Sequence, residues 1–180
     1  RYSLPVSALE GLIDAHVGDL YADPPPSMND LEGYCGECFS VPYRLAAMIL
    51  SPEQSKAVAD VAGHGGVAEG LLDSVARWPL LLRRLRVMLP QDVMAQFSLT
   101  RESVLAGTEP AQVRLALEHM LAMADAHHAK ASAALVGLKP EEAPAFLPLA
   151  LLVLFTTRVR RAMPDAVASL PQWRMQFELW

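Results

Sequence analysis

Apolar side chains recur along this sequence at intervals of three and four residues, the spacing of one face of an α-helix. Strict alternation of apolar and polar residues, which marks a half-buried strand, does not persist anywhere. Prolines and glycines divide the helical pattern into segments. The pattern therefore predicts an all-α fold, and a chain of 180 residues has the length of one domain, 1–180.

Long helices are predicted between these breaks. In the first, Ser7 and Glu10 have the spacing of a capping box, and three consecutive prolines end it. Pro42 is expected to kink the second helix, and Ser51 with Pro52 to begin the third. The predicted long helices cover residues 5–23, 27–50, 51–85 with a break near Pro79, 111–136 and 143–163, with short ones at 89–97 and after Thr100.

Composition narrows the classes of protein. The chain is 52% hydrophobic and has 20 acidic and 15 basic residues, a net charge of −5. This balance excludes a disordered tail and argues against a nucleic-acid partner. No secretory leader precedes the first helix, and the start at Arg1 indicates a processed or truncated chain. The apolar run 143–155 is shorter than the roughly 20 residues of a membrane span, so we expect a core helix and a cytoplasmic protein, with contact to membranes at most peripheral.

Several motifs have a plain structural interpretation. Cys35 and Cys38 form C-x-x-C without a second pair or a preceding strand, so we expect helix-packing residues and not a metal or redox site. Glycines dot the third helix, where close packing is favoured over a phosphate loop because no lysine and serine follow. The histidines on the fourth helix lack metal-binding spacing and are expected to be solvated or capped. These residues are Gly63, Gly65, Gly66, Gly70, His119, His127 and His128.

Acidic pairs spaced by four residues place two carboxylates on one helix face, where they can share Mg²⁺. Asp19 with Asp23, and Glu69 with Asp73, have this spacing. The second pair lies within the glycine-dotted helix and is the better candidate metal site. The alternative is an exposed pair of acids with no ligand.

Arginines follow closely on that pair, among apolar residues 78–85. They are suited to gripping a diphosphate or an anionic membrane surface, or they are solvated and paired with acids on neighbouring helices. A second basic group at 158–161 lies in the last helical turns, where cations complement the helix dipole without any ligand. The first group consists of Arg77, Arg83, Arg84 and Arg86.

Two short motifs point to a family. Residues 30–35 read DLEGYC, and Leu89-Pro90 is followed by Asp92. With the helix before them, they resemble the "DLxxYC" and "YLPxD" segments of the squalene/phytoene synthase family, head-to-head prenyl synthases; Met88 replaces the tyrosine. The resemblance implies an isoprenoid-synthase-like helical bundle. It spans the whole chain and corresponds to about the last two thirds of a family domain, so the N-terminal helices, with their aspartate-rich motif, are expected to be missing.

The resemblance also implies site residues. In that family, Mg²⁺ held by two aspartate-rich helices neutralises a prenyl diphosphate as its C–O bond breaks, and an apolar cavity shields the carbocation. Tyr34 matches the family's cavity tyrosine, the candidate catalytic residue. The candidate diphosphate-binding residues are Arg77, Arg83 and Arg84, and the candidate metal ligands of an active enzyme are Glu69 and Asp73.

Departures from the family pattern indicate a degenerate site. When the family pattern is counted back from Leu89, the two aspartates of its second aspartate-rich helix fall on Arg77 and Leu81. The guanidinium group of an arginine repels Mg²⁺. Residues 39–42 replace a small glycine-containing run. Several stretches resemble a degenerate branch that includes a mitochondrial complex I assembly factor; they are 19–24, 63–68, 77–90, 146–150 and 171–174.

Three hypotheses follow. The first is a pseudoenzyme without a cofactor that binds a lipid, a prenyl chain or a protein partner, as in membrane-complex assembly. The alternative is an active Mg²⁺-dependent prenyl diphosphate transferase of isoprenoid biosynthesis. The third is a peripheral membrane protein held by residues 77–86.

Overall fold

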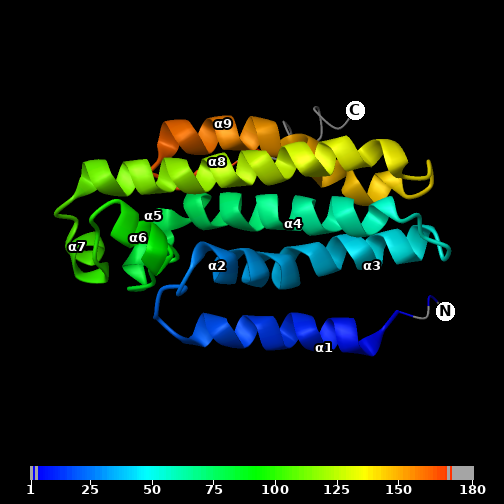
Figure 1. Cartoon of the computed structure of the whole chain (residues 1–180), viewed down its shortest axis with the longest axis horizontal. Helices are drawn as coiled ribbons and strands as arrows, with labels where there is room; N and C mark the ends of the chain where they lie inside the picture. Colours follow the sequence, from blue (N-terminus) through cyan, green and yellow to red (C-terminus); the bar gives the residue numbers. More distant parts are fainter. Residues whose placement is uncertain (1, 3, 170, 172–180) are drawn as a thin grey trace.

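The computed structural model describes residues 2, 4–169 and 171, and these form a layered bundle of helices without a strand. Successive long helices run in opposite directions and stack in the order of the chain, from α1 through α2–α3 and α4 to α8 and α9 (Figure 1). Their bounds are α1 Val6–Ala15, α2 Met28–Cys35, α3 Val41–Leu50, α4 Ala57–Ala76, α8 Pro110–Ala134 and α9 Leu152–Ala162.

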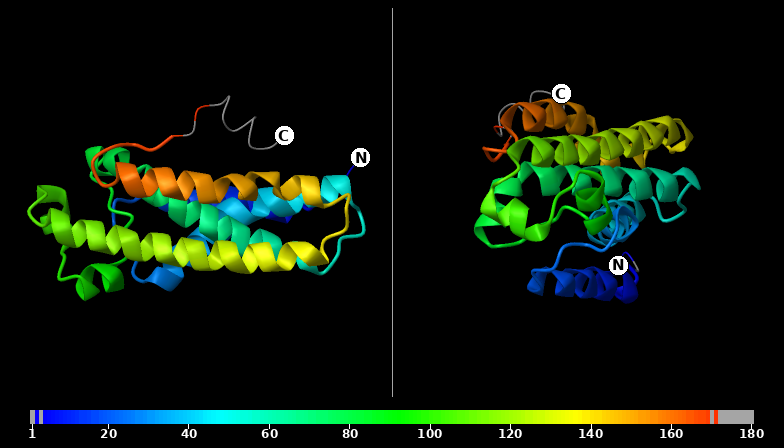
Figure 2. Two further views of the ribbon diagram at one scale, coloured as in Figure 1. Left: turned by 90° about the horizontal axis from the view of Figure 1, so that it is seen from above. Right: turned by 60° about the vertical axis from the view of Figure 1, so that its left-hand side comes forward.

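Short helices close one end of the bundle. They are α5 (Trp78–Arg83), α6 (Gln91–Gln96) and α7 (Arg101–Ala106), and both views of Figure 2 show them clustered beside the ends of α4 and α8. Thr100 caps α7 in a reciprocal capping box with Ser103, as its position predicts. The prediction that the chain breaks near Pro79 is confirmed, because α4 ends at Ala76 and α5 begins at Trp78.

Helix α4 is the centre of the core. Its buried residues extend around most of its circumference, because it packs against α8 on one side and against α2 and α3 on the other. A helix that is apolar all round is typical of such a central position. The largest fully buried side chains include Leu71, Leu72, Leu117, Leu121 and Trp78.

The glycines of α4 permit a close approach of neighbouring chain. A Cβ on Gly66 would lie 2.4 Å from the backbone nitrogen of Ser40, and one on Gly70 would lie 2.7 Å from Cys35 Sγ. A Cβ on Gly65 would meet Leu149, whereas one on Gly63 would meet nothing within 4 Å. Close packing is therefore confirmed for three of the four glycines.

The second predicted helix is continuous, and its distortion is a π-helical segment that lies before Pro42. Residues Gly36–Ser40 (η2) form a π-helical segment between α2 and α3, and Pro42 lies in the first turn that follows it. A proline is tolerated in the first turn of an α-helix, although it has no backbone N–H to donate. The segment brings Ser40 onto Gly66, so the distortion of the helix and the close packing occur together.

Two local predictions are wrong. The cap of α1 is Pro5, with no side-chain hydrogen bond from Ser7 or Glu10. Ser51 ends α3 and does not begin α4, because residues 51–56 form an irregular connection. A 3₁₀ segment, η1 (His16–Leu20), continues α1, and the apolar residues of both are largely exposed; Leu9, Ile13, Val17 and Leu20 are examples.

The apolar segment after residue 142 is only partly a core helix. It begins as a 3₁₀ helix, η4 (Ala143–Leu151), and continues as α9. Phe146, Leu149 and Leu152 face inward, while Leu147 and Val153 are exposed. Among the described helices, residues 143–162 alone have the length and mean hydropathy (1.4) to cross a membrane, with 33% of that window buried. The tail, residues 170–180, carries two of the three tryptophans and is expected to dock on the bundle, but apart from Pro171 it lies outside the described residues.

Candidate functional site: the polar face of helix α4

Three charged residues spaced by four positions line one face of α4 and its C-cap. Glu69 and Asp73 are followed by Arg77, and Arg77 Nη2 lies 2.5 Å from Asp73 Oδ2. The Asp73 side chain is 30% exposed and that of Arg77 is 55% exposed, so the ion pair stands at the edge of the helix packing. The spacing by four residues makes the pair a consequence of helical geometry.

Glu69 is held by a tyrosine from α3. The Tyr43 hydroxyl donates a hydrogen bond of 2.6 Å to Glu69 Oε2, and its ring stacks on Phe146, with centroids 5.7 Å apart. Burial raises the pKa of Glu69, and this outweighs the hydrogen bond from Tyr43; the nearby charge of Asp73 adds to the rise. Burial also raises the pKa of Asp73, against the opposing effect of Arg77.

A pocket opens beside the Tyr43–Glu69 pair. Its volume is about 320 Å³, and apart from that pair its walls are Cys38, Phe39, Pro42, Ala145 and Pro148. Apolar walls with one hydrogen-bonded polar pair are typical of a site for an apolar ligand with a single polar group.

Tyr34 belongs to a neighbouring cluster around Asp19. Its hydroxyl donates to Asp19 Oδ1 at 2.8 Å, and Arg86 Nη2 lies 2.6 Å from the same oxygen. Burial alone would raise the pKa of Asp19, but the hydrogen bonds from Arg86, His16 and Tyr34 hold it below its usual range. Burial and the hydrogen bond to Asp19 raise the pKa of Tyr34. The cluster ties η1 to the end of α2 and to the chain that follows α5.

The sequence-derived candidates thus separate into three places. Glu69, Asp73 and Arg77 share one face of α4, and Tyr34 lies in the Asp19 cluster, which reaches the pocket through Cys38. Arg83 and Arg84 are exposed at the end of α5, and their guanidinium groups take no part in any hydrogen bond or ion pair among the described residues. The second basic group partly pairs with α8, since Arg160 binds Glu118 and Asp125.

The fit to a magnesium ion is poor. In the part of the chain that the structure describes, no three His, Cys, Asp or Glu side chains converge as a metal site. Arg77 also places a guanidinium where a cation shared by Glu69 and Asp73 would bind. Asp19 pairs with Arg86, His16 and Tyr34 instead of Asp23. The residues present do not form the site that Mg²⁺ prefers.

Sequence reasoning missed two contributors to these clusters. Tyr43 had no signal, because it is 26 residues from Glu69 and meets it only through helix packing. Arg86 was grouped with the other arginines of its segment, although it alone points inward, onto Asp19. The spacing of arginines along the sequence does not distinguish one that pairs with a partly buried acid from one that is solvated.

The cysteines and histidines behave largely as their patterns predict. Cys35 and Cys38 are buried and free, and Cys35 packs on Gly70. His128 bonds the carbonyl oxygen of Leu149 at 3.1 Å, and the ring of His119 lies against Phe97.

His127 instead forms an interhelical pair. Its Nδ1 lies 3.1 Å from Nδ1 of His64 on α4, and its Nε2 lies 3.4 Å from Glu32 Oε1 on α2. The pair links three helices on the other side of α4.

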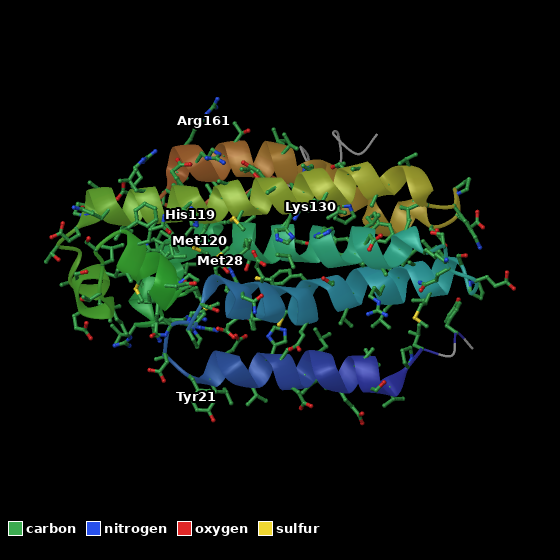
Figure 3. The ribbon with its side chains drawn as sticks, viewed as in Figure 1. Tyr21, Met28, His119, Met120, Lys130 and Arg161 are labelled. Carbon is green, nitrogen blue, oxygen red and sulfur yellow. The ribbon has the colours of Figure 1, made fainter. Side chains whose placement is uncertain are left out.

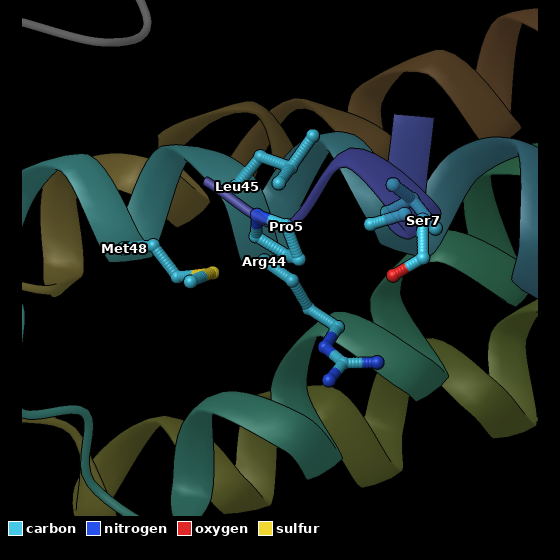
Figure 4. Close-up of a pocket in the computed structure, with 7 residues that line it drawn as sticks. Pro5, Ser7, Arg44, Leu45 and Met48 are labelled. Atoms are coloured by element: carbon cyan, nitrogen blue, oxygen red, sulfur yellow. The ribbon is translucent and has the colours of Figure 1, made fainter. Parts of the chain in front are cut away.

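A second pocket lies between α1 and α3. Its volume is about 260 Å³, and Figure 4 shows the Arg44 side chain between those of Met48 and Ser7. It shares no lining residue with the pocket beside Glu69.

An all-α bundle of antiparallel helices around a central apolar helix is the architecture of the isoprenoid synthases, as the sequence predicts. The sequence matches the squalene/phytoene synthase family model over residues 1–180. The chain therefore belongs to the squalene/phytoene synthase family. No curated protein matches it by sequence.

Solved structures show the same fold. The squalene synthase HpnC from Alicyclobacillus acidocaldarius superposes with a TM-score of 0.75 at 19% identity, over 89% of this chain and 59% of that one. A dehydrosqualene synthase in complex with a ligand superposes with a TM-score of 0.73 at 16% sequence identity, over 98% of this chain and 63% of that one. YisP from Bacillus subtilis superposes with a TM-score of 0.77 at 17% sequence identity, over 99% of this chain and 72% of that one. The chain thus spans about three fifths of the length of the first two proteins.

Proposed function

We propose that this family member does not ionise prenyl diphosphates at the α4 face, and that it binds a lipid or prenyl chain in the pocket beside Glu69. The supporting observation is the 2.5 Å ion pair between Arg77 and Asp73. It neutralises one of the two carboxylates available to Mg²⁺ and adds a repelling charge at the same place. A role in assembling a membrane complex is part of this proposal and rests on the resemblance to the degenerate branch.

The pocket supports the binding part of the proposal. Its walls are mostly apolar, and its carboxyl group is already bonded to Tyr43, so the site favours an uncharged or weakly polar ligand over a diphosphate. A diphosphate would have to approach Glu69 and Asp73 without a cation between them, and like charges repel.

Catalysis is tested by incubating the protein with Mg²⁺ and farnesyl or geranylgeranyl diphosphate and measuring released diphosphate. The expected result is no release above the buffer control. Release at an ordinary enzymatic rate would overturn the proposal in favour of the transferase, and Asp73→Ala should then abolish it.

Binding is tested with farnesol, titrated by calorimetry. Pro148→Trp places a large ring at the exposed edge of the pocket and should weaken binding. Pro144→Trp changes an exposed proline of the same segment that does not line the pocket, and should leave binding unchanged. Equal affinity of both variants for farnesol would exclude this pocket as the binding site.

A further inference from the structure

Helix α5 has an inward and an outward face. Trp78 and Leu81 are buried, while Leu80, Arg83 and Arg84 are exposed at positions three and four residues apart. No hydrogen bond or ion pair among the described residues occupies the guanidinium groups of Arg83 and Arg84. The outward face therefore combines free cations with an apolar side chain.

The turn that ends α5 contains a leucine in a left-handed conformation. The amide of Arg86 donates to the carbonyl of Leu81 at 3.0 Å, and that of Leu85 donates to Leu82 at 2.9 Å. These bonds define a Schellman motif with Leu85 at the position that glycine usually occupies. Its φ is +56°, and a side chain there crowds the backbone.

The same motif ends α6 and α7, where the left-handed residues are Ser98 (φ +55°) and Gly107 (φ +66°). Glycine and small polar residues tolerate this conformation best. Leucine is thus the exception among these three turns.

Packing does not account for this leucine. Leu85 is 62% exposed, and Leu80 in α5 is 40% exposed, so neither side chain is used mainly in the core. The contact of Leu85 with α7 is made by its backbone and not by its side chain, since Arg101 Nη2 donates a hydrogen bond of 3.2 Å to the Leu85 carbonyl oxygen. An unfavourable conformation that exposes an apolar side chain is a mark of a functional position.

We propose that Leu80, Leu85, Arg83 and Arg84 form a patch, the α5 patch, that binds the surface of an anionic membrane. The leucines would enter the boundary of the acyl chains, and the guanidinium groups would bind lipid phosphates. A fluid lipid interface accepts a side chain that projects from a convex turn, whereas a protein partner needs a matching pocket for it. Because the chain carries a net charge of −5, attraction to an anionic surface depends on this local patch.

The test is co-sedimentation of the protein with vesicles of phosphatidylcholine alone or mixed with phosphatidylglycerol. The wild-type protein should bind only the mixed vesicles. Replacing both Arg83 and Arg84 with glutamine should weaken binding about 25-fold, at about fivefold for each cation near the surface. Leu85→Gly should weaken it about tenfold through lost apolar burial.

The melting temperature of Leu85→Gly and two control variants separate this role from folding. Leu85→Gly relieves the left-handed leucine, so it should unfold at the same temperature as the wild type or higher while binding more weakly. Ser98→Gly makes the same backbone change at α6, and Arg161→Gln removes a cation from the outer face of α9 (Figure 3). Both controls should bind like the wild type.

A wild-type protein that ignores phosphatidylglycerol, or a Leu85→Gly variant that binds as tightly as the wild type, would overturn the proposal. A patch that serves an acidic protein instead would give the first of these results. The outcome is independent of diphosphate release and of farnesol binding, so it can fail or succeed separately from the proposed function.

Discussion

Arg77 and Asp73 stand one turn apart on α4 and form an ion pair at 2.5 Å. The resemblance predicts that this arginine replaces an aspartate of the family pattern, and the structure shows that Arg77 pairs with the neighbouring acid. Burial raises the pKa of Asp73, which disfavours the charged form of this carboxyl group, while Arg77 acts in the opposite direction. The pair places a guanidinium against one of the two carboxylates of this face, which supports the proposal that the face does not bind a metal.

Arg77→Asp should create a divalent-cation site. It removes the guanidinium and gives α4 carboxylates at positions 69, 73 and 77, on adjacent turns of one face. Without metal, the variant should be less stable than the wild type by about 1 kcal/mol, since a partly exposed ion pair is lost and like charges are added. Adding Mn²⁺ should raise its melting temperature and leave that of the wild type unchanged, as measured by calorimetry.

Arg83→Asp makes the same charge change at an exposed position away from the acids, and it supplies the control. A wild type whose melting temperature rises with Mn²⁺ as much as that of Arg77→Asp would contradict the role assigned to Arg77.

Gly66→Ala should destabilise the fold strongly. The added Cβ would lie 2.4 Å from the backbone nitrogen of Ser40, and backbone cannot move aside as a flexible side chain can. The expected loss is about 3 kcal/mol in urea unfolding. Gly63→Ala, in the same helix with nothing within 4 Å, should instead gain about 0.5–1 kcal/mol from the better helix propensity of alanine. Equal effects of the two changes would show that the close approach at Ser40 is not required.

Glu142 should contribute to stability in a pH-dependent way. Its buried carboxylate accepts hydrogen bonds from the amide and hydroxyl of Ser55, both at 2.6 Å, and from the amide of Lys139 at 2.9 Å. Burial opposes ionisation, but these hydrogen bonds outweigh it and hold the pKa of Glu142 below its usual value. Glu142→Ala should cost about 2 kcal/mol at neutral pH, because the donors lose their partner.

The sign of the pH effect follows from the lowered pKa. The stabilisation by Glu142 is complete above the pKa of an unfolded glutamate, about 4.3, and is lost as the pH falls through the folded-state value. The difference in unfolding free energy between the wild type and Glu142→Gln should therefore shrink in acid. A difference that stays constant from neutral pH to pH 3, or roughly there, would contradict this assignment.

The His64–His127 pair should weaken the fold in mild acid. Burial, and next the charge of His127, lower the pKa of His64, while Asp60 and Glu32 act in the opposite direction and Lys130 in the same one. A lowered folded-state pKa means that the unfolded chain takes up the proton first, so stability falls as the pH drops below about 6.5. Urea unfolding between about pH 7 and pH 5 should show this slope, and His64→Gln should reduce it. An unchanged slope in the variant would assign the effect to another group.

Much of the fold could be predicted because helices are local. The spacing of apolar residues, the capping threonine at position 100 and the prolines at positions 79 and 110 mark helix positions from neighbouring residues alone. The predictions failed where packing decides. Ser7 and Glu10 have the spacing of a capping box but form no side-chain cap. The π-helical segment at 36–40 coincides with the approach of Ser40 to Gly66, which is a contact between distant residues.

The candidate site could be predicted only in part, for the same reason. The spacing of Glu69, Asp73 and Arg77 along one helix already places them on one face. The partners Tyr43 and Asp19 come from other helices, and no periodicity relates residues across a bundle.

The amino-acid sequence by itself determined an all-α chain and membership of the squalene/phytoene synthase family, and its resemblance to the family pattern predicts that Arg77 stands where that pattern has an acid. Only the tertiary structure decided that Arg86 turns inward to Asp19 while Arg83 and Arg84 remain in solvent, and that Leu85 is held exposed in a left-handed turn. Helix formation depends on neighbours within a few residues, but the environment of a side chain depends on which distant helices pack beside it.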